Sequence, residues 1–330
     1  MELPFTPDQL FFELTPKKFG KWALKAFRYQ YAENKVYQEF CDLLGKTPAN
    51  VDQLKDIPFL PISFFKTHQV ISGPGNPTHL FTSSGTTGSQ ASSHLVLAID
   101  WYESSFLQAF SLFYGNIEDY VVLALLPSYL EREGSSLIYM TERLIAESKQ
   151  AESGFYLFEH DELIETIQRL ESEGRQILLI GVTYALLDLL EKGPFQWKNT
   201  LIMETGGMKG KRKEMVREEL HDILKAGFGV SSIHSEYGMT ELLSQAYSLG
   251  EGVFECPPWM QILIREPEDP FHYLPFDKQG GINVIDLANI HSCCFIATQD
   301  LGKMDQTGRF EVLGRFDHAD LRGCNLMIPQ

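Results

Sequence analysis

The sequence lacks several features that would place it in common protein classes. No apolar run approaches the roughly 20 residues that a membrane-spanning helix needs, and the N-terminus shows no charged segment followed by an apolar one, as a secretion signal would. Its five cysteines include no Cys-x-x-Cys pair, which argues against a zinc ribbon. Internal repeats and low-complexity tracts are also absent. We therefore expect a cytoplasmic globular protein with reduced thiols and no membrane span.

Positive charge is scarce. The 330 residues include 28 Lys and Arg against 44 Asp and Glu, a net charge of −16. Because a nucleic-acid partner needs a basic surface that neutralises phosphates, we expect no nucleic-acid partner. A small anionic substrate remains compatible, since the potential inside one pocket can differ from that of the average surface.

The spacing of apolar residues divides the chain into three regions. Residues 1–75 are expected to form a helical N-terminal region packed on the core, with a helical pattern over 7–46. Residues 76–250 alternate short apolar runs with amphipathic stretches, which predicts an α/β fold of parallel sheets flanked by helices. Residues 251–330 are expected to form a small β-rich subdomain.

The individual elements follow from the same pattern. Helices are expected at 99–114, 136–147, 161–173, 185–191 and 211–226. Strands are expected at 79–82, 121–126, 177–181, 200–204 and 230–234, and then at 253–255, 261–265, 281–286, 294–298 and 309–313.

A loop rich in hydroxyl groups follows the first of these strands. The segment Thr82–Ser89 contains six Ser or Thr residues and two glycines. Glycines let backbone N–H groups turn toward an anion and hydroxyls add donors, so the composition suits a phosphate-binding loop. No Gly-Lys-Ser/Thr follows, so it is not a Walker A loop. A flexible polar connection is the alternative interpretation.

Four further motifs follow in order along the chain. They are Glu204-Thr-Gly-Gly-Met208, Ser235-Glu-Tyr-Gly-Met-Thr-Glu241, Ala297-Thr-Gln-Asp-Leu-Gly302 and Gly314-Arg-Phe-Asp317. Each alone has a structural interpretation: a tight turn, a helix start, a common turn and a surface hairpin, respectively. Five segments in this order make coincidence implausible.

Together these motifs resemble those of the adenylate-forming enzymes, the superfamily of acyl-CoA synthetases and peptide-synthetase adenylation domains. The resemblance implies the N-terminal domain of that fold, with ATP and Mg²⁺ as cofactors. It assigns the ATP phosphates to the hydroxyl loop, residues Thr82, Ser83, Ser84, Gly85, Thr86, Thr87 and Gly88. It assigns the rest of the nucleotide to Gly206, Gly207, Tyr237, Gly238, Asp300 and Arg315, with Asp300 on the ribose hydroxyls.

The same resemblance implies the chemistry of the remaining motif residues. Glu241 would hold Mg²⁺, and the expected catalytic residues are Thr86, Thr240, Glu241 and Arg315. His234 and Met239, beside the Tyr-Gly motif, are expected to line the acyl pocket.

Within the superfamily, three segments resemble the LuxE-type acyl-protein synthetases of bacterial luminescence. They are Ile57-Pro-Phe-Leu-Pro-Ile-Ser-Phe-Phe-Lys66, Gly206-Gly-Met-Lys-Gly-Lys-Arg212 and Asp320-Leu-Arg-Gly-Cys-Asn-Leu326. Those enzymes activate a fatty acid, take the acyl group onto a serine, and pass it to a partner reductase. This sequence has no serine after Ser292, which leaves Cys324 as the candidate acyl acceptor in a C-terminal motif.

Three functions stay open at this point. The first is an acyl-protein synthetase acting on a fatty acid, with a partner protein and a homodimer both compatible. The second is an acyl- or aryl-CoA ligase resembling phenylacetate-CoA ligase, and the third is a non-catalytic nucleotide-binding subunit. Only 13 residues follow Asp317, so we expect the mobile C-terminal domain of the superfamily, with its lysine, to be absent. Lys66, Lys209 and Lys211 are substitutes by position.

Overall fold

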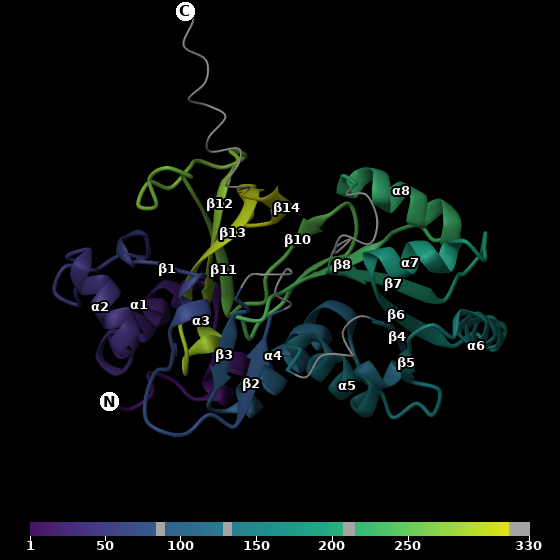
Figure 1. The fold of residues 1–330 in the computed structure, drawn as a ribbon, viewed down its shortest axis with the longest axis horizontal. Helices are drawn as coiled ribbons and strands as arrows, with labels where there is room; N and C mark the ends of the chain where they lie inside the picture. Colours follow the sequence, from purple (N-terminus) through teal and green to yellow (C-terminus); the bar gives the residue numbers. More distant parts are fainter. Residues whose placement is uncertain (84–89, 128–133, 207–214, 317–330) are drawn as a thin grey trace, which may run out of the picture.

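Two six-stranded sheets and a two-stranded hairpin form the framework of the molecule (Figure 1). The computed structural model describes residues 1–83, 90–127, 134–206 and 215–316. The buried hydrophobic residues of these ranges form one continuous cluster that runs from the N-terminal helices to the last strand. None of the described helices is long and apolar enough to cross a membrane.

The first sheet is mainly parallel, with strand order β5-β4-β6-β7-β8-β9. Only the pair β8–β9 is antiparallel. Its central strands are buried almost throughout, as expected for a parallel sheet covered on both faces. The strands are β4 Tyr120–Leu125, β5 Gly154–Tyr156, β6 Gln176–Val182, β7 Thr200–Thr205, β8 His234–Tyr237 and β9 Ala246–Ser248.

Helices cover this sheet on both sides. In Figure 1, α7 and α8 lie on one side of it, whereas α4 and α5 lie on the other. The helices are α4 Ile99–Tyr114, α5 Ser136–Ser148, α6 His160–Ser172, α7 Thr183–Leu190 and α8 Arg217–Phe228. The alternation of strands and helices confirms the predicted α/β class.

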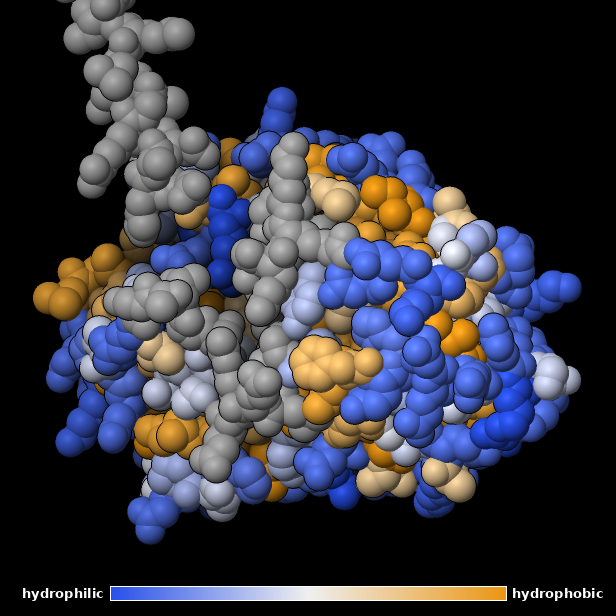
Figure 2. Space-filling model, turned by 45° about the vertical axis from the view of Figure 1, so that its right-hand side comes forward, coloured by the Kyte–Doolittle hydropathy of each residue, from blue (hydrophilic) through white to orange (hydrophobic). Residues whose placement is uncertain are grey.

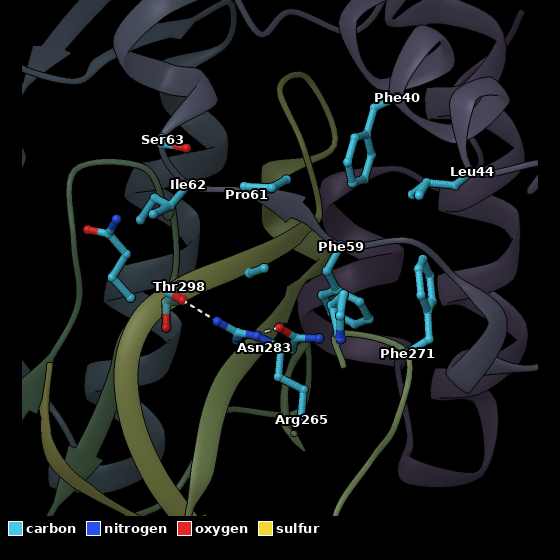
Figure 3. Close-up of a pocket in the computed structure, with 13 residues that line it drawn as sticks. Phe40, Leu44, Phe59, Pro61, Ile62, Ser63, Arg265, Phe271, Asn283 and Thr298 are labelled. Atoms are coloured by element: carbon cyan, nitrogen blue, oxygen red, sulfur yellow. Dashed lines mark hydrogen bonds between the residues drawn. The ribbon is translucent and has the colours of Figure 1, made fainter. Parts of the chain in front are cut away.

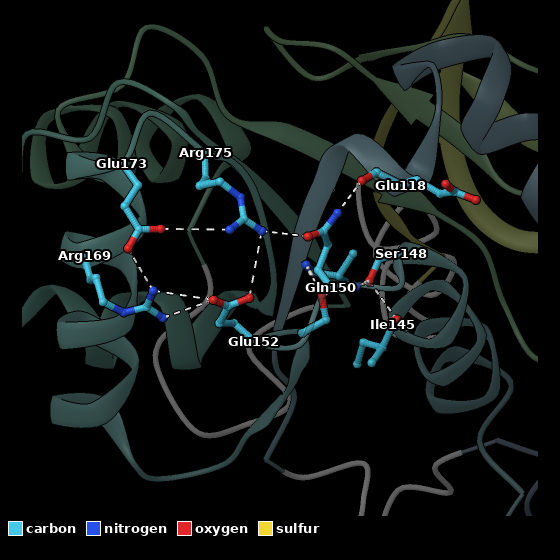
Figure 4. Close-up of polar contacts among 10 residues, drawn as sticks. Glu118, Ile145, Ser148, Gln150, Glu152, Arg169, Glu173 and Arg175 are labelled. Carbon is cyan, nitrogen blue, oxygen red and sulfur yellow. Dashed lines mark hydrogen bonds and ion pairs between the residues drawn. The ribbon is translucent and has the colours of Figure 1, made fainter.

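Exposed ion pairs join α6 to the chain around it (Figure 4). Arg169 reaches Glu152 at 3.4 Å and Glu173 at 3.0 Å, and Arg175 donates to Gln150 Oε1 at 2.6 Å. Solvent screens these exposed charges, so the contacts add little to the stability of the fold. They link α6 to the residues on either side of β5.

The second sheet is antiparallel, with order β10-β14-β13-β12-β11, and it holds the residues that follow position 250. Its strands are β10 Val253–Phe254, β11 Met260–Arg265, β12 Gly280–Asp286, β13 Phe295–Met304 and β14 Phe310–Arg315. The short strand β1 Leu60–Pro61 comes from the N-terminal region and pairs in parallel with β13. The proposed boundaries at residues 75 and 250 stay predictions, and β1 joins the first region to the last sheet.

The N-terminal helices pack against this second sheet. They are the π-helix η1 Gln9–Glu13, α1 Pro16–Glu33, α2 Lys35–Leu43, the 3-10 turn η2 Leu54–Asp56 and the short α3 Phe64–Thr67. Buried Gln30 on α1 donates to the carbonyls of Asn289 and Ile290 and accepts from the Cys294 N–H at 2.9 Å. One amide side chain thus satisfies backbone groups about 260 residues away.

Several predicted elements need correction. The strand expected at 230–234 is wrong, because parallel pairing with β7 begins only at His234, opposite Met203. The helix expected at 211–226 begins at Arg217 among the described residues, and 207–214 lie outside them. The strand expected at 294–298 extends to Met304, because β14 pairs with its second half. The strand β3 Ser93–Val96, which forms a hairpin with β2 His79–Thr82, was not predicted.

Candidate functional site

The carboxyl ends of the parallel strands bring two of the sequence motifs to one edge of the sheet. Gly206 directly follows β7 and adopts a positive φ of 74°, a conformation that favours glycine. Tyr237 ends β8, the neighbouring strand. Ligands of open α/β sheets bind outside the carboxyl ends of the strands. Gly207 lies outside the described residues.

Tyr237, Asp300 and Arg315 meet between the two sheets. The Tyr237 hydroxyl donates to Asp300 Oδ2 at 2.8 Å, and Arg315 Nε donates to Oδ1 of the same carboxylate at 3.2 Å. Burial, with the nearby Asp300 charge, raises the pKa of Tyr237 well above its usual value, so the hydroxyl stays a donor. The three residues come from β8, β13 and β14, and only the antiparallel register of β13 and β14 sets Asp300 opposite Arg315.

This arrangement fits a ribose. Each carboxylate oxygen has a second lone pair, so Asp300 can still accept from ribose hydroxyls while it is held by Tyr237 and Arg315. The Asp300 side chain is nearly buried, whereas that of Arg315 is 78% exposed and is free to turn toward a ligand.

Glu241 is a buried carboxyl without an ion-pair partner in the described part of the chain. It is 5% exposed, and burial raises its pKa, opposed by a hydrogen bond with Ser92 and by the charges of Arg315 and Lys66. A hard cation that bridges phosphates needs a carboxylate and few other protein ligands. Glu241 therefore fits a Mg²⁺ ion whose other ligands come from the nucleotide. The described residues contain no cluster of three His, Cys, Asp or Glu side chains that would form a complete metal site.

Only the base of the hydroxyl loop belongs to the described residues. Ser83 and Ser92 close it with two hydrogen bonds, from Ser83 N–H to the Ser92 carbonyl at 3.1 Å and from Ser92 N–H to Ser83 Oγ at 2.8 Å. The Thr82 N–H donates to the Gly134 carbonyl, which ties the loop base to the chain beyond β4. The loop therefore connects two strands of a hairpin. Ser84, Gly85, Thr86, Thr87 and Gly88 lie outside the described residues.

A buried charged cluster supports the two strand ends. Arg217 Nη1 lies 2.5 Å from Glu204 Oε1 and also donates to Ser235 Oγ, joining α8 to β7 and β8. Burial opposes ionisation of Glu204, but hydrogen bonding with His221 and the charge of Arg217 outweigh it, so its pKa is lowered. Thr205 donates to Glu236 at 2.6 Å, and burial raises the pKa of Glu236 to about 7.

The residues expected to line an acyl pocket lie beside this cluster. His234 contacts the Tyr114 ring at 5.7 Å, its Nδ1 is buried without a hydrogen-bond partner among the described residues, and burial lowers its pKa to about 4. Met239 packs against the core from a partly buried position. A side chain at Gly238 would meet Glu236 Oε1 at 2.4 Å, so glycine leaves room for that carboxyl. Because burial lowers its pKa to about 4, His234 is neutral at pH 7.

Sequence reasoning missed the residues that hold the Thr240–Glu241 turn in place. Buried His94 on β3 bonds through Nδ1 to the Thr240 carbonyl at 2.7 Å, and Asn289 donates to the Glu241 carbonyl at 2.7 Å. Asp286 accepts the N–H groups of Leu243 and Ser244. These residues lie between 42 and 146 positions from the backbone groups that they bond, so no local pattern identifies them.

Cys324 and Asp317 lie outside the described residues, so the proposed acyl acceptor stays a prediction. The four other cysteines are unpaired and largely buried, and burial raises the pKa of each. A thiol with a raised pKa is a poor nucleophile at neutral pH.

The face of the molecule in Figure 2 shows small separate groups of hydrophobic residues among hydrophilic ones.

Comparison with known proteins finds one match to nearly the whole chain and two to parts of it. Residues 5–98 match the family described as "Acyl-protein synthetase, LuxE". The long-chain-fatty-acid–luciferin-component ligase of Vibrio harveyi is 24% identical over 369 aligned positions, which cover 98% of this chain and 93% of that protein. The protein of the same name from Photorhabdus luminescens is 33% identical over 90 residues, covering 26% of this chain and 77% of that protein.

Solved structures share the fold. ATP-bound MatB from Rhodopseudomonas palustris matches with a TM-score of 0.57 and 18% identity, over 74% of this chain and 49% of that one. The chain thus spans about half the length of MatB. A 2-hydroxyisobutyryl-CoA ligase, solved with an acyl-AMP and CoA, matches with a TM-score of 0.68 and 15% identity over 92% of this chain and 69% of that one. The predicted fold, that of the N-terminal part of adenylate-forming enzymes, is confirmed.

Proposed function

We propose that the chain is an acyl-protein synthetase of the LuxE type, which activates a fatty acid with ATP and transfers the acyl group to a protein nucleophile; the match of residues 5–98 to that family and the similarity to the Vibrio harveyi ligase support this. The observation that carries the proposal is the Asp300 carboxylate, held between Tyr237 and Arg315 at the edge where the parallel strands end. Buried Glu241 follows Tyr237 by four residues, which suits one site for ribose and phosphates.

The first half-reaction forms an acyl-adenylate. A carboxylate oxygen of the acid attacks the α-phosphorus of ATP, a new C–O–P linkage forms, and the bond to pyrophosphate breaks. Asp300 would fix the ribose by accepting hydrogen bonds from its hydroxyls, and Tyr237 holds Asp300 in place. The hydrogen bond from Ser92 N–H to Ser83 Oγ closes the base of the hydroxyl loop.

Charge neutralisation at the phosphates is the main demand on the site. When Mg²⁺ is bound, it would supply a Lewis acid at the phosphate oxygens, with Glu241 as its protein ligand. The positive charges of Arg315 and Lys66 both oppose the burial that raises the pKa of Glu241, so this carboxyl is within electrostatic reach of two cations. Lys66 on α3 is therefore our candidate for the cation that assists the attacking carboxylate.

The second half-reaction transfers the acyl group. A protein thiolate or alkoxide attacks the acyl carbon, the bond from that carbon to the AMP oxygen breaks, and AMP leaves. Cys324 is the proposed nucleophile within this chain. A long-chain fatty acid is the proposed substrate class, because the relatives from Vibrio harveyi and Photorhabdus luminescens are both named long-chain-fatty-acid–luciferin-component ligases.

The decisive experiment is ATP–pyrophosphate exchange with Mg²⁺ across acids from acetate to palmitate, with benzoate and phenylacetate included. We expect exchange with long-chain acids and its loss in Glu241→Ala and Thr86→Ala. Glu251→Ala is the matched control, because Glu251 is 80% exposed. Exchange that survives Glu241→Ala would refute the role of Glu241. ATP binding without exchange for any acid would leave a non-catalytic nucleotide-binding role.

A second assay follows the acyl group. Incubation with ATP and labelled palmitate should label the protein, and the label should be released by neutral hydroxylamine, as expected for a thioester. Cys324→Ala should remove the label while exchange persists, whereas Cys256→Ala, which removes a buried thiol, should keep it. Transfer to added CoA without labelling of the protein would instead identify an acyl-CoA ligase.

A further inference from the structure

A cavity of about 290 Å³ lies between the N-terminal helices and the antiparallel sheet, and its lining residues Thr298 and Gln299 directly precede Asp300 of the proposed nucleotide site (Figure 3). Apolar side chains line one part of it. They include Phe40 on α2, Leu44 directly after α2, and Phe271 in the connection between β11 and β12. Polar groups of Arg265, Asn283 and Thr298, on β11 to β13, line another. The cavity is therefore amphipathic.

The polar part contains a buried cation without a carboxylate. Arg265 is 9% exposed, and its guanidinium donates to the carbonyls of Ile282 and Thr298 and to Asn283 Oδ1, all at 2.7 or 2.8 Å. No Asp or Glu among the described residues forms an ion pair with it. Burial lowers the pKa of Arg265, which reflects the cost of removing this charge from water, and Tyr273, Asp300 and Tyr237 oppose this shift without forming an ion pair with it. Neutral acceptors satisfy its N–H groups but do not balance its charge.

A second donor in the same part is poorly satisfied. Asn283 is fully buried and its Oδ1 accepts from Arg265, while its Nδ2 forms no hydrogen bond of normal geometry within the described ranges and lies beside the Tyr273 hydroxyl. A buried amide N–H₂ without an acceptor costs free energy that a ligand oxygen would recover. Arg265 and Asn283 thus both require negative charge or an acceptor at the same place.

We propose that this cavity is a second ligand site, which binds an amphiphilic monocarboxylate with its carboxylate at Arg265 and Asn283 and its apolar tail against Phe40 and Phe271. A planar carboxylate offers two oxygens to the planar guanidinium and amide donors. The cavity of about 290 Å³ has room for a small amphiphilic acid.

This site differs from the acyl pocket expected near the nucleotide. Neither His234 nor Met239 lines the cavity, and neither Tyr237 nor Glu241 does. Carboxylate binding here requires no ATP, so it is measured separately from acid activation.

The test is calorimetric titration of the full chain, without nucleotide, with octanoate and with 1-octanol, which has the same tail and no charge. We expect octanoate to bind at least tenfold more tightly. Arg265→Gln should abolish this preference. Because Arg265 is buried and its replacement can impair folding, Leu44→Glu provides a second test: it places a carboxylate at the cavity and should weaken octanoate binding at least tenfold.

Leu43→Glu is the matched control, because Leu43 is 88% exposed and does not line the cavity, whereas Leu44 is 38% exposed and does. Leu43→Glu should bind octanoate as the parent does. Equal affinity for octanoate and octanol, no binding of octanoate, or unchanged binding in Leu44→Glu would overturn the proposal.

Discussion

The Tyr237 hydroxyl donates to the Asp300 carboxylate at 2.8 Å, and this hydrogen bond joins the last parallel strand of one sheet to the longest strand of the other. The two residues are 63 positions apart in the sequence. Their contact turns two separate motifs into one site. Arg315, opposite Asp300 on β14, completes a group whose members come from three strands.

Asp300→Asn is expected to weaken nucleotide binding. The amide keeps one acceptor but loses the charge that Arg315 contacts, and a hydrogen bond to a charged group contributes about 1.5 to 3 kcal/mol. The KM for ATP in pyrophosphate exchange should therefore rise by roughly 10- to 100-fold. Asp305→Asn is the control, since Asp305 bonds only within its own turn, to Thr307 and Arg309. An unchanged KM in Asp300→Asn would refute its proposed contact with ribose.

Arg217→Ala is expected to destabilise the fold. It leaves the Glu204 carboxylate buried without its closest cation, and breaking a buried pair from one side costs about 3 kcal/mol. Urea unfolding should show a lower free energy of unfolding at pH 7. Lys225→Ala removes the exposed ion pair with Asp222 on the same helix and should leave stability nearly unchanged. Restoration by Glu204→Gln in the Arg217→Ala background would confirm that the buried charge is the cause.

Glu236→Gln is expected to stabilise the protein at high pH only. The residue retains some exposure, yet burial of its carboxyl raises its pKa from 4.5 to about 7. Between these values the unfolded chain has lost a proton that the folded chain keeps, so stability conferred by Glu236 is full below pH 4.5 and lost as pH rises through 7. The variant should exceed the parent by about 1 to 3 kcal/mol at pH 8 and by little at pH 4.5. Urea unfolding at both values checks this, with the exposed Glu255→Gln as control.

His94→Gln is expected to reduce the loss of stability in acid. Burial lowers the pKa of His94 from 6.5 to about 4, so between these values the unfolded chain binds a proton that the folded chain excludes. Stability from this residue is therefore full above pH 6.5 and falls as pH decreases toward 4. The parent should lose roughly 2 kcal/mol more than the variant between pH 7 and pH 4.5.

Glutamine at position 94 can still donate to the Thr240 carbonyl, so the two proteins should have similar stability at pH 7. The exposed His272→Gln provides the matched control and should follow the parent at every pH. Parallel curves for the parent and His94→Gln would contradict the buried neutral histidine.

Local sequence patterns predicted the elements whose own residues decide their conformation. The helix Ile99–Tyr114 and the strand His79–Thr82 were expected at the boundaries that the structure shows. Prediction failed where pairing decides the outcome. Strand β3 has only four residues and exists because it pairs with β2, and β8 begins at His234 because Met203 is its partner.

The sequence by itself determined the α/β class and the order of the motifs, because apolar periodicity and glycine or hydroxyl-rich turns act over a few neighbouring residues. Only the tertiary structure decided that Tyr237, Asp300 and Arg315 meet, that His94 and Asn289 hold the Thr240–Glu241 turn, and that Arg265 is buried without a carboxylate. These relationships depend on strand register and on packing between distant segments. Burial then sets the pKa values of Glu236 and His94, since desolvation depends on what surrounds a group in the folded protein.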